Sequence, residues 1–215
     1  MSNMIISLHI PKTAGTSLMT SLQYVYGKRV LNHNKDPNLT YNSSFATISQ
    51  SYDLVHGHIN LDRASHLTER ASLIFTFLRD PVERVVSSYY YHRQLDKVTN
   101  MASKQINEND LSLQGFAELP SQRNLQHRMI WPVSKQKVEF YGFVETYQTS
   151  LEQLSRLLSV KLAVDTQNVN VNAKKTSSSR YAIPDDLRSY IASLNSKDFE
   201  LYKWAFKRSM DKSDT

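Results

Sequence analysis

The sequence predicts an α/β fold, a parallel β-sheet flanked by helices on both faces in three layers. Short apolar runs of strand length alternate with amphipathic helical segments, the pattern of βαβ units. Polar clusters follow directly after three of these runs, where parallel sheets bind their ligands. The length of 215 residues fits a single domain, 1–215.

The amino-terminal part of the chain predicts a strand, a helix and a long loop. Met4–Ile10 is an apolar run of strand length that a proline ends. A helix is expected over Thr16–Tyr26, because aliphatic side chains recur there on one face. Residues 32–51 are rich in Asn, Ser and Thr and predict a loop, and residues 52–55 predict a short strand.

The middle of the chain contains the strongest strand pattern. Ser72–Leu78 is a β-branched and aromatic run. Asp80 is a suitable N-cap and Pro81 a suitable first residue for the helix that follows, whose valines and tyrosines recur at helical spacing. Residues 94–137 are polar, with two modest helical segments, and predict an inserted helical lobe over the core.

The carboxy-terminal part predicts one more strand and three helices. The strand is Val138–Val144, and a leucine-rich helix follows it through Leu158. Residues 165–183 are basic and rich in Asn and Ser, which predicts a loop. Helices are expected at about 184–194 and 196–210.

The charge of the chain is concentrated in two stretches. The net charge is +6, yet Asp36 is the one carboxylate in the first 52 residues, and Thr166–Pro184 carries three cations and no acid. Positive potential of this kind attracts a nucleotide, an anionic polysaccharide or nucleic acid. Charge alone is equally compatible with a solvated basic surface.

The absence of cysteine narrows the possible chemistry. Disulfide frameworks, thiolate catalysis and cysteine-ligated zinc are excluded, and a reducing compartment is favoured. No stretch approaches the roughly 20 apolar residues of a membrane span, and Met1–Ile10 lacks the features of a signal peptide. These observations predict a cytoplasmic protein without an integral membrane segment.

The first polar cluster, His9–Ser17, joins the first strand to the first helix. A turn with Gly, Thr and Ser at this position directs backbone N–H groups and hydroxyls at an anion, and the helix dipole adds to the attraction. The turn is P-loop-like, but it is not a Walker A loop, because Lys12 precedes Gly15. Only five glycines occur, so we expect that Gly15 and Gly57 lie where a side chain does not fit. Taken alone, the cluster is better explained as an ordinary turn with an N-cap threonine.

The second cluster begins at Arg79, directly after the strongest strand. A guanidinium at the carboxyl edge of a sheet suits a phosphate. Ser87, two helical turns later, can donate to the same phosphate. Arg84 lies one helical turn from Ser87. The alternative is a capped helix with surface arginines.

The third cluster is His56-Gly57-His58, which follows a short strand. Two imidazoles at this spacing can supply a general base and a helper near neutral pH. The spacing also occurs in metal sites, but no third ligand is evident, so we expect no metal.

In this order, His9–Leu18, His56–His58 and Arg79–Tyr91 resemble the carbohydrate O-sulfotransferases that use 3′-phosphoadenosine-5′-phosphosulfate (PAPS). The chain looks most similar to the heparan sulfate and uronyl 2-O-sulfotransferases. Asn124–Met129 is also similar to a segment of the 6-O-sulfotransferases. The likeness covers most of the chain thinly, while the first three segments are specific. The lack of an anchor and of cysteines favours a bacterial-type soluble member.

The resemblance implies transfer of a sulfuryl group from PAPS to an acceptor hydroxyl, expected on a saccharide, with 3′-phosphoadenosine-5′-phosphate (PAP) as product. His58 is the expected general base, and His56 assists it or contacts the substrate. Residues 94–137 would line the acceptor groove. The residues implied to hold PAPS are Lys12, Thr13, Ala14, Gly15, Thr16 and Ser17 at the 5′-phosphosulfate, Arg79 and Ser87 at the 3′-phosphate, and Lys174, Lys175 and Thr176 in a segment over the nucleotide.

Two other function classes remain open from the residues alone. A P-loop-type kinase would need carboxylates for Mg²⁺, and Asp53 and Asp80 are the acids near suitable positions. A polyanion- or nucleic-acid-binding protein would use the basic surface and the twelve tyrosines. Most of these tyrosines fall on predicted core stripes, so we expect no nucleic-acid partner.

Overall fold

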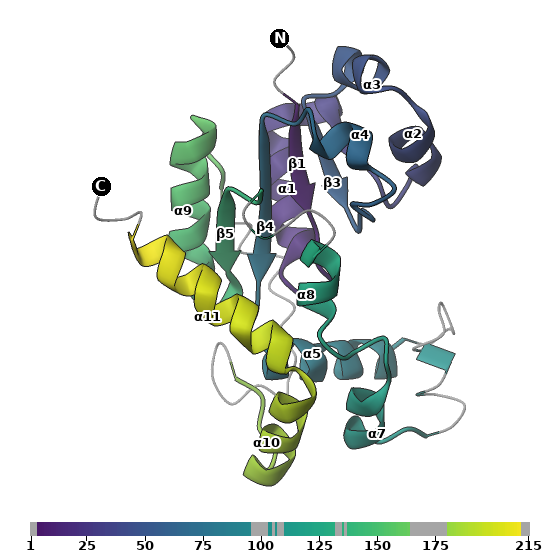
Figure 1. Cartoon of the computed structure of the whole chain (residues 1–215), viewed down its shortest axis with the longest axis vertical. Helices are drawn as coiled ribbons and strands as arrows, with labels where there is room; N and C mark the ends of the chain where they lie inside the picture. The colour runs from purple at the N-terminus through teal and green to yellow at the C-terminus, as the bar shows by residue number, and fades with distance from the viewer. Residues whose placement is uncertain are drawn as a thin grey trace.

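The protein is built around a five-stranded, all-parallel β-sheet with the strand order β2-β3-β1-β4-β5 (Figure 1). The computed structural model describes residues 4–95, 103, 104, 106, 110–131, 135, 137–163 and 180–211. The strands are β1 (Ile5–Leu8), β2 (Val30–Asn32), β3 (Leu54–Gly57), β4 (Leu73–Leu78) and β5 (Phe140–Phe143). The predicted fold class is confirmed.

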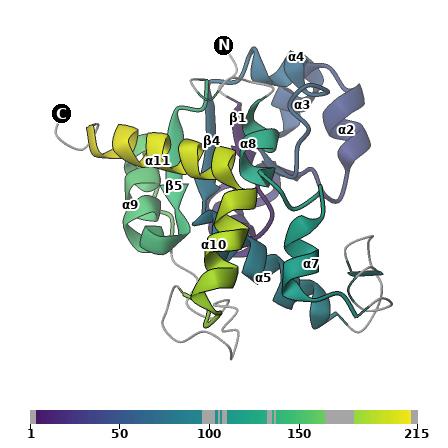
Figure 2. The same ribbon diagram turned by 60° about the horizontal axis from the view of Figure 1, so that its bottom comes forward.

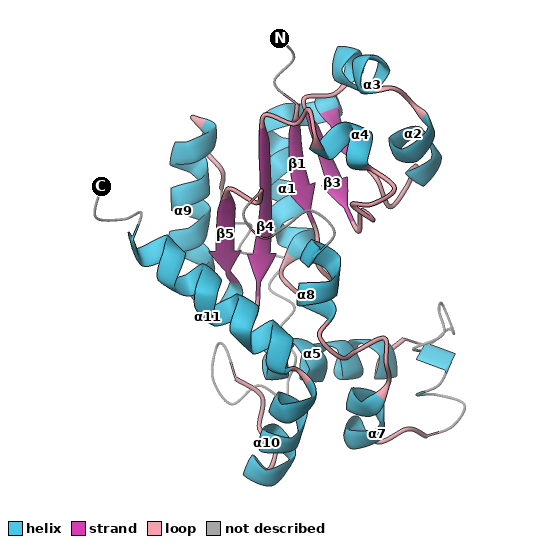
Figure 3. Ribbon diagram, in the orientation of Figure 1, coloured by secondary structure: helices cyan, strands magenta, loops and turns pink. Residues whose placement is uncertain are grey.

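Helices cover both faces of the sheet and make three layers (Figures 1 and 3). One face packs on α1 (Gly15–Tyr26) and α9 (Tyr147–Leu158). The other face packs on α3 (Phe45–Ser51), α4 (Ser65–Thr68), α8 (Leu125–Ile130) and α11 (Ser196–Asp211). The alternation of β4 fits this arrangement, because Phe75 and Phe77 join the first core and Ile74 and Leu78 join the second.

A smaller core lies below the carboxyl edge of the sheet, where α5 (Pro81–Arg93), α7 (Leu113–Glu118) and α10 (Asp185–Leu194) pack together (Figure 2). Within the predicted lobe 94–137, α7 and Ile106 join this core, and α8 joins the core on the sheet face. In the part of the chain that the structure describes, no helix is long and apolar enough to cross a membrane.

The prediction of a loop over residues 32–51 is wrong. Two short helices occupy this stretch, α2 (Pro37–Asn42) and α3. Each has its own cap, because Asp36 Oδ1 accepts from Leu39 N at 3.0 Å and Ser44 Oγ accepts from Thr47 N at 3.1 Å. The polar residues that suggested a loop therefore begin helices. The short strand β2 was also not predicted.

The remaining elements follow the predictions closely. The helices α1, α9, α10 and α11 and the strands β1, β3, β4 and β5 occur at or near the expected positions, with shifted ends. Asp80 caps α5 as predicted, since its Oδ1 accepts from Val82 N at 2.9 Å and from Glu83 N at 3.0 Å.

The helix α5 is more deeply buried than an amphipathic helix with surface arginines. Every residue from Pro81 to Tyr89 is buried, and Arg84 is completely enclosed. The Arg84 guanidinium donates to the carbonyl oxygen of Gln122 at 2.5 Å, and burial lowers the pKa of Arg84 to about 10. The reading of Arg84 as a surface residue is therefore wrong.

Gln126 connects α8 to the end of β4. Its side-chain amide donates to Arg79 O at 2.8 Å, and its Oε1 accepts from Arg79 N at 2.9 Å. The helix α8 is fixed in turn by Asp198 of α11, whose Oδ1 accepts from His127 N at 2.8 Å. Residues of the segment that resembles 6-O-sulfotransferases thus fix the backbone of Arg79.

We expect Gln126→Ala to destabilise the protein by about 1–3 kcal/mol, because it leaves a buried N–H and a buried C=O of Arg79 without partners. Urea unfolding followed by circular dichroism measures the change in the free energy of unfolding. Gln148→Ala is the matched control, since Gln148 is exposed and bonds only to a neighbouring side chain on α9. Equal stabilities of the two variants would contradict the assignment.

Candidate active site

The three polar clusters of the sequence meet at the carboxyl edge of the sheet. The strand β1 lies between β3 and β4, and Leu8 pairs with Gly57 on one side and with Thr76 on the other. The residues that follow these strands therefore lie next to one another. From β1 the chain passes to β2 on one side of β1, and from β3 it passes to β4 on the other side. The end of β1 is therefore a topological switch point, where parallel α/β sheets bind ligands.

The loop between β1 and α1 is shaped to hold an anion. Lys12 and Ala14 have φ angles of 71° and 63°, in the left-handed region that is unfavourable for residues with a side chain. No side chain caps α1. The first backbone N–H groups of a helix have no partner within it, so those of Gly15, Thr16 and Ser17 can bind an anion.

The side chains of this loop differ in their availability. Thr13 is buried, and its hydroxyl and its backbone N–H both donate to Ile10 O, at 2.8 and 3.3 Å, so both donors of Thr13 are already engaged within the loop. The side chain of Thr16 is exposed and that of Ser17 half-buried. The predicted group of hydroxyl donors is therefore reduced to these two.

Three histidines stack beside the loop. The ring of His9 lies between the rings of His56 and His58, with centroid distances of 5.3 and 4.3 Å. His9 also packs against Gly15, where an added Cβ would lie 1.9 Å from His9 Nε2. At Gly57 the φ angle is 153° and an added Cβ would lie 2.8 Å from His33 Cβ. Both glycines thus lie where a side chain does not fit, as predicted.

The hydrogen bond of His58 fixes its tautomer. Nδ1 lies 2.8 Å from His9 O, and because a carbonyl oxygen only accepts, Nδ1 carries the proton. Nε2 therefore has a free lone pair, and the residue lies at the surface. Burial of part of the ring lowers the pKa of His58, which favours the neutral form. This is the protonation state of a general base.

The other two rings of the stack are less accessible. His56 is buried, and its Nδ1 lies 2.9 Å from Ser7 Oγ. Burial and the neighbouring His58 lower the pKa of His56 to about 4, and the pKa of His9 falls to about 2 for the same reasons. Both rings are neutral at physiological pH, so they support His58 without adding charge.

Two cations lie side by side at the end of the sheet. Lys12 Nζ lies 3.8 Å from the centroid of the Tyr91 ring, and Arg79 donates to Lys12 O at 3.3 Å. Burial, with a contribution from Arg79, lowers the pKa of Lys12 to about 8. Arg79 is buried and its Nε has no hydrogen-bond partner among the described residues. Two close cations of this kind favour a bound anion.

The remaining predicted site residues lie in different situations. Ser87 is buried on α5, two turns after Arg79. Lys174, Lys175 and Thr176 lie outside the described residues. Tyr91 was not predicted as a site residue, although it belongs to the segment that carried the resemblance. The contact of Tyr91 with Lys12 joins two distant segments, and no local sequence pattern indicates such a contact.

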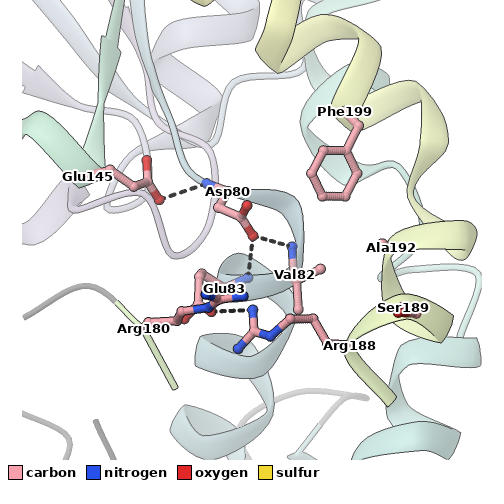
Figure 4. Close-up of a pocket in the computed structure, with 9 residues that line it drawn as sticks. All are labelled: Asp80, Val82, Glu83, Glu145, Arg180, Arg188, Ser189, Ala192 and Phe199. Atoms are coloured by element: carbon pink, nitrogen blue, oxygen red, sulfur yellow. Dashed lines mark hydrogen bonds and ion pairs between the residues drawn. The ribbon is translucent and has the colours of Figure 1, made fainter. Parts of the chain in front are cut away.

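A pocket of about 360 Å³ opens beside the start of α5 (Figure 4). Its charged residues are largely paired: Asp80 caps the helix, the backbone N–H of Asp80 donates to Glu145 at 2.8 Å, and Glu83 forms an ion pair with Arg188 at 2.8 Å. None of its lining residues belongs to the His9–Ser17 loop. With three carboxylates in its walls, the pocket does not suit a phosphate dianion.

The carboxylates that a kinase would require are engaged elsewhere. Asp53 forms a bidentate ion pair with Arg29 at 2.6 Å and precedes β3, at the opposite edge of the sheet from the loop. Asp80 caps α5. Within the described ranges, no cluster of three or more His, Asp or Glu residues could hold a metal ion.

The family of the chain follows from comparison with known proteins. The model of the sulfotransferase family matches residues 2–205, so the chain belongs to this family. No curated protein sequence matches it. The narrower resemblance to the 2-O- and 6-O-sulfotransferases stays a prediction.

Two solved structures of sulfotransferases are similar to this one, and the first shares its fold. A sulfotransferase from Alicyclobacillus acidocaldarius is 13% identical, with a TM-score of 0.50 over 94% of this chain and 95% of that chain. Mouse sulfotransferase SULT7A1, solved in complex with PAP, is 13% identical, with a TM-score of 0.47 over 100% of this chain and 86% of that chain.

We expect Gly15→Ala to displace the imidazole of His9 and to disturb its stacking on His58, because the new Cβ would overlap the ring. Histidine resonances in nuclear magnetic resonance spectra report both rings. Gly27→Ala is the control, since no atom lies within 4 Å of its added Cβ, although its φ of 56° adds backbone strain. Unchanged His9 and His58 resonances in Gly15→Ala would contradict the packing.

Proposed function

We propose that this sulfotransferase moves the sulfuryl group of PAPS to a hydroxyl of a carbohydrate acceptor, with His58 as the general base. The observation that supports this most directly is the hydrogen bond from His58 Nδ1 to His9 O, which leaves Nε2 unprotonated next to the anion-binding loop. A base must be within reach of the proton that it removes and must be neutral beforehand.

The co-substrate would be held at both ends. In the proposal, Lys12 and the first-turn amides of α1 bind the 5′-phosphosulfate, and Arg79 with Ser87 binds the 3′-phosphate. The contact of the Arg79 guanidinium with the carbonyl of Lys12 supports this, because an anion between the two cations would offset their repulsion. Lys174, Lys175 and Thr176 would close over the nucleotide.

The transfer step follows from these roles. The acceptor oxygen forms a bond to sulfur while the bond from sulfur to the bridging phosphate oxygen breaks. The acceptor proton passes to His58 Nε2, and the electron pair of the broken bond stays on the phosphate of PAP. Lys12 and the loop amides stabilise the charge that develops there, as preorganised donors do in related transfers.

His9 and His56 would act as positioning residues. The carbonyl oxygen of His9 accepts a hydrogen bond from Nδ1–H of His58, and the His9 ring stacks on the His58 ring. His56 is buried and bonded to Ser7, which supports the assisting role over a direct contact with substrate.

The direct test is incubation of the chain with radiolabelled PAPS and a panel of neutral, uronic and sulfated saccharides, with transfer scored for each acceptor. Calorimetry with PAP measures donor binding separately. PAP binding together with transfer to a saccharide would support the proposal. Mg²⁺-dependent consumption of ATP, or an absence of PAP binding, would overturn it.

Substitutions separate the proposed roles. We expect His58→Ala to lower kcat by about 10²–10⁴, the contribution of a general base, and Lys12→Ala to lower it by about 10²–10³, the contribution of one preorganised donor. Arg79→Ala should mainly weaken PAP binding. Steady-state kinetics and calorimetry measure these changes.

Exposed or distant residues serve as controls for these variants. Lys28→Ala removes an exposed lysine, and His66→Ala removes a histidine of α4 that bonds to Ser43 O. Both should keep turnover near that of the unmodified chain. Near-normal turnover of His58→Ala would show that another group is the base.

The dependence of kcat/KM on pH should be bell-shaped. His58 must be neutral, and its pKa is lowered, so activity should be lost as the pH falls through a value below 6.5. Lys12 must be charged, so activity should also be lost as the pH rises through about 8. Bound phosphosulfate favours the ammonium form and should move the alkaline limb of kcat upward.

Lys12→Arg tests the alkaline limb, because a guanidinium stays charged throughout this range. The loss of activity near pH 8 should disappear in Lys12→Arg, even if this variant has a lower kcat than the unmodified chain. Persistence of the limb would assign it to a different group.

A further inference from the structure

A second pocket, of about 780 Å³, lies at the junction of α8 and α11, outside the groups assigned above. We name it the α8–α11 groove. Figures 1 and 2 show these two helices next to each other on one face of the sheet. Its volume is in the range that holds small-molecule ligands. Its lining residues are Pro120, Arg123, Asn124, His127, Arg128, Trp131, Lys197 and Glu200.

An exposed aromatic ring forms one wall of the groove. The side chain of Trp131 is 72% exposed, and its ring stacks on His127 with centroids 5.1 Å apart and an interplanar angle of 27°. Stacking holds the indole in one orientation, and most of its surface stays exposed. A flat apolar face of this kind suits the C–H face of a sugar ring.

Cations outnumber acids around this ring. Arg123, Arg128 and Lys197 line the groove against the single carboxylate of Glu200. Arg128 also donates to Ser121 O at 2.8 Å, which holds its guanidinium in place. None of the three cations lies within ion-pair distance of a described carboxylate. The groove therefore attracts an anion whose charges are spread around an apolar ring.

The scaffold of the groove is rigid on its inner side. Asn124 has a φ of 50°, and its Oδ1 accepts from Lys197 N at 2.9 Å. His127 N donates to Asp198 Oδ1 at 2.8 Å. The same helix α8 turns Gln126 inward to the backbone of Arg79. The groove thus lies on the outer face of the element that fixes the end of β4.

From these observations we propose that the α8–α11 groove is an accessory binding site for an anionic saccharide, with a sugar ring stacked on Trp131 and its sulfate or carboxylate groups bound by Arg123, Arg128 and Lys197. The inference rests on the proposed function in one respect, since it makes this site a part of acceptor recognition. The site would hold a unit of a longer acceptor chain away from the transferred sulfuryl group.

Binding of a heparin-derived octasaccharide to the full chain, without PAPS and at about 150 mM salt, tests the proposal by calorimetry. Trp131→Ala should weaken binding about tenfold or more, because exposed tryptophans at binding sites contribute strongly. Trp131→Phe, which keeps a ring, should retain most of the affinity. Because the side chain of Trp131 is highly exposed, we expect both variants to keep the fold.

Charge is tested with a pair of matched double variants. Arg123→Glu with Lys197→Glu reverses two charges in the groove, and Arg156→Glu with Lys161→Glu makes the same change in net charge at exposed positions in and after α9. The first pair should weaken binding about tenfold or more and the second less than about threefold. Equal losses in the two pairs would overturn the proposal, because binding would then follow net charge alone.

Two further outcomes would also overturn it. The first is equal binding of an uncharged maltooligosaccharide of the same length. The second is equal binding of single-stranded DNA that does not depend on Trp131, which would indicate a general polyanion surface. PAP binding should stay unchanged in the groove variants. An unmodified chain that does not bind PAP would instead reject the proposed function, and the measured binding of the octasaccharide to the groove would still hold.

Discussion

The close approach of Lys12 and Arg79 is the constraint around which the carboxyl edge of the sheet is organised. The two cations repel each other, with Arg79 buried and Lys12 half-buried, so the chain must fix both by other means. Arg79 is held through its backbone by Gln126, and Lys12 by a left-handed turn and the ring of Tyr91. Neighbouring parallel strands bring the two side chains together, because β1 and β4 end at the same edge.

Local patterns were sufficient to predict much of this arrangement. The run Leu73–Leu78 and the cap at Asp80 are visible in the sequence because strand periodicity and capping act over a few residues. The same reasoning failed over residues 32–51, where caps at Asp36 and Ser44 stabilise helices too short to show a periodic pattern. The strand β2 has only three residues, and its pairing with β3 is a tertiary contact.

The roles that sequence reasoning did not predict depend on contacts between distant segments. Gln126 bonds to Arg79 across 47 positions, and the α8–α11 groove combines residues near position 125 with Lys197 and Glu200. A glutamine or a tryptophan in isolation carries no signal of such a partner. The position of His58 after a strand was predictable from the sequence, but its tautomer was not, because the carbonyl of His9 sets it.

The left-handed conformation of Lys12 restricts how the family can vary at this position. Glycine would adopt a φ of 71° without strain but would remove the ammonium group, and a β-branched residue would add steric conflict. Neighbouring positions offer no substitute, since one step along a chain moves a side chain by about 3.8 Å. If Lys12 binds PAPS as proposed, relatives that bind PAPS in the same way should keep a lysine at this position.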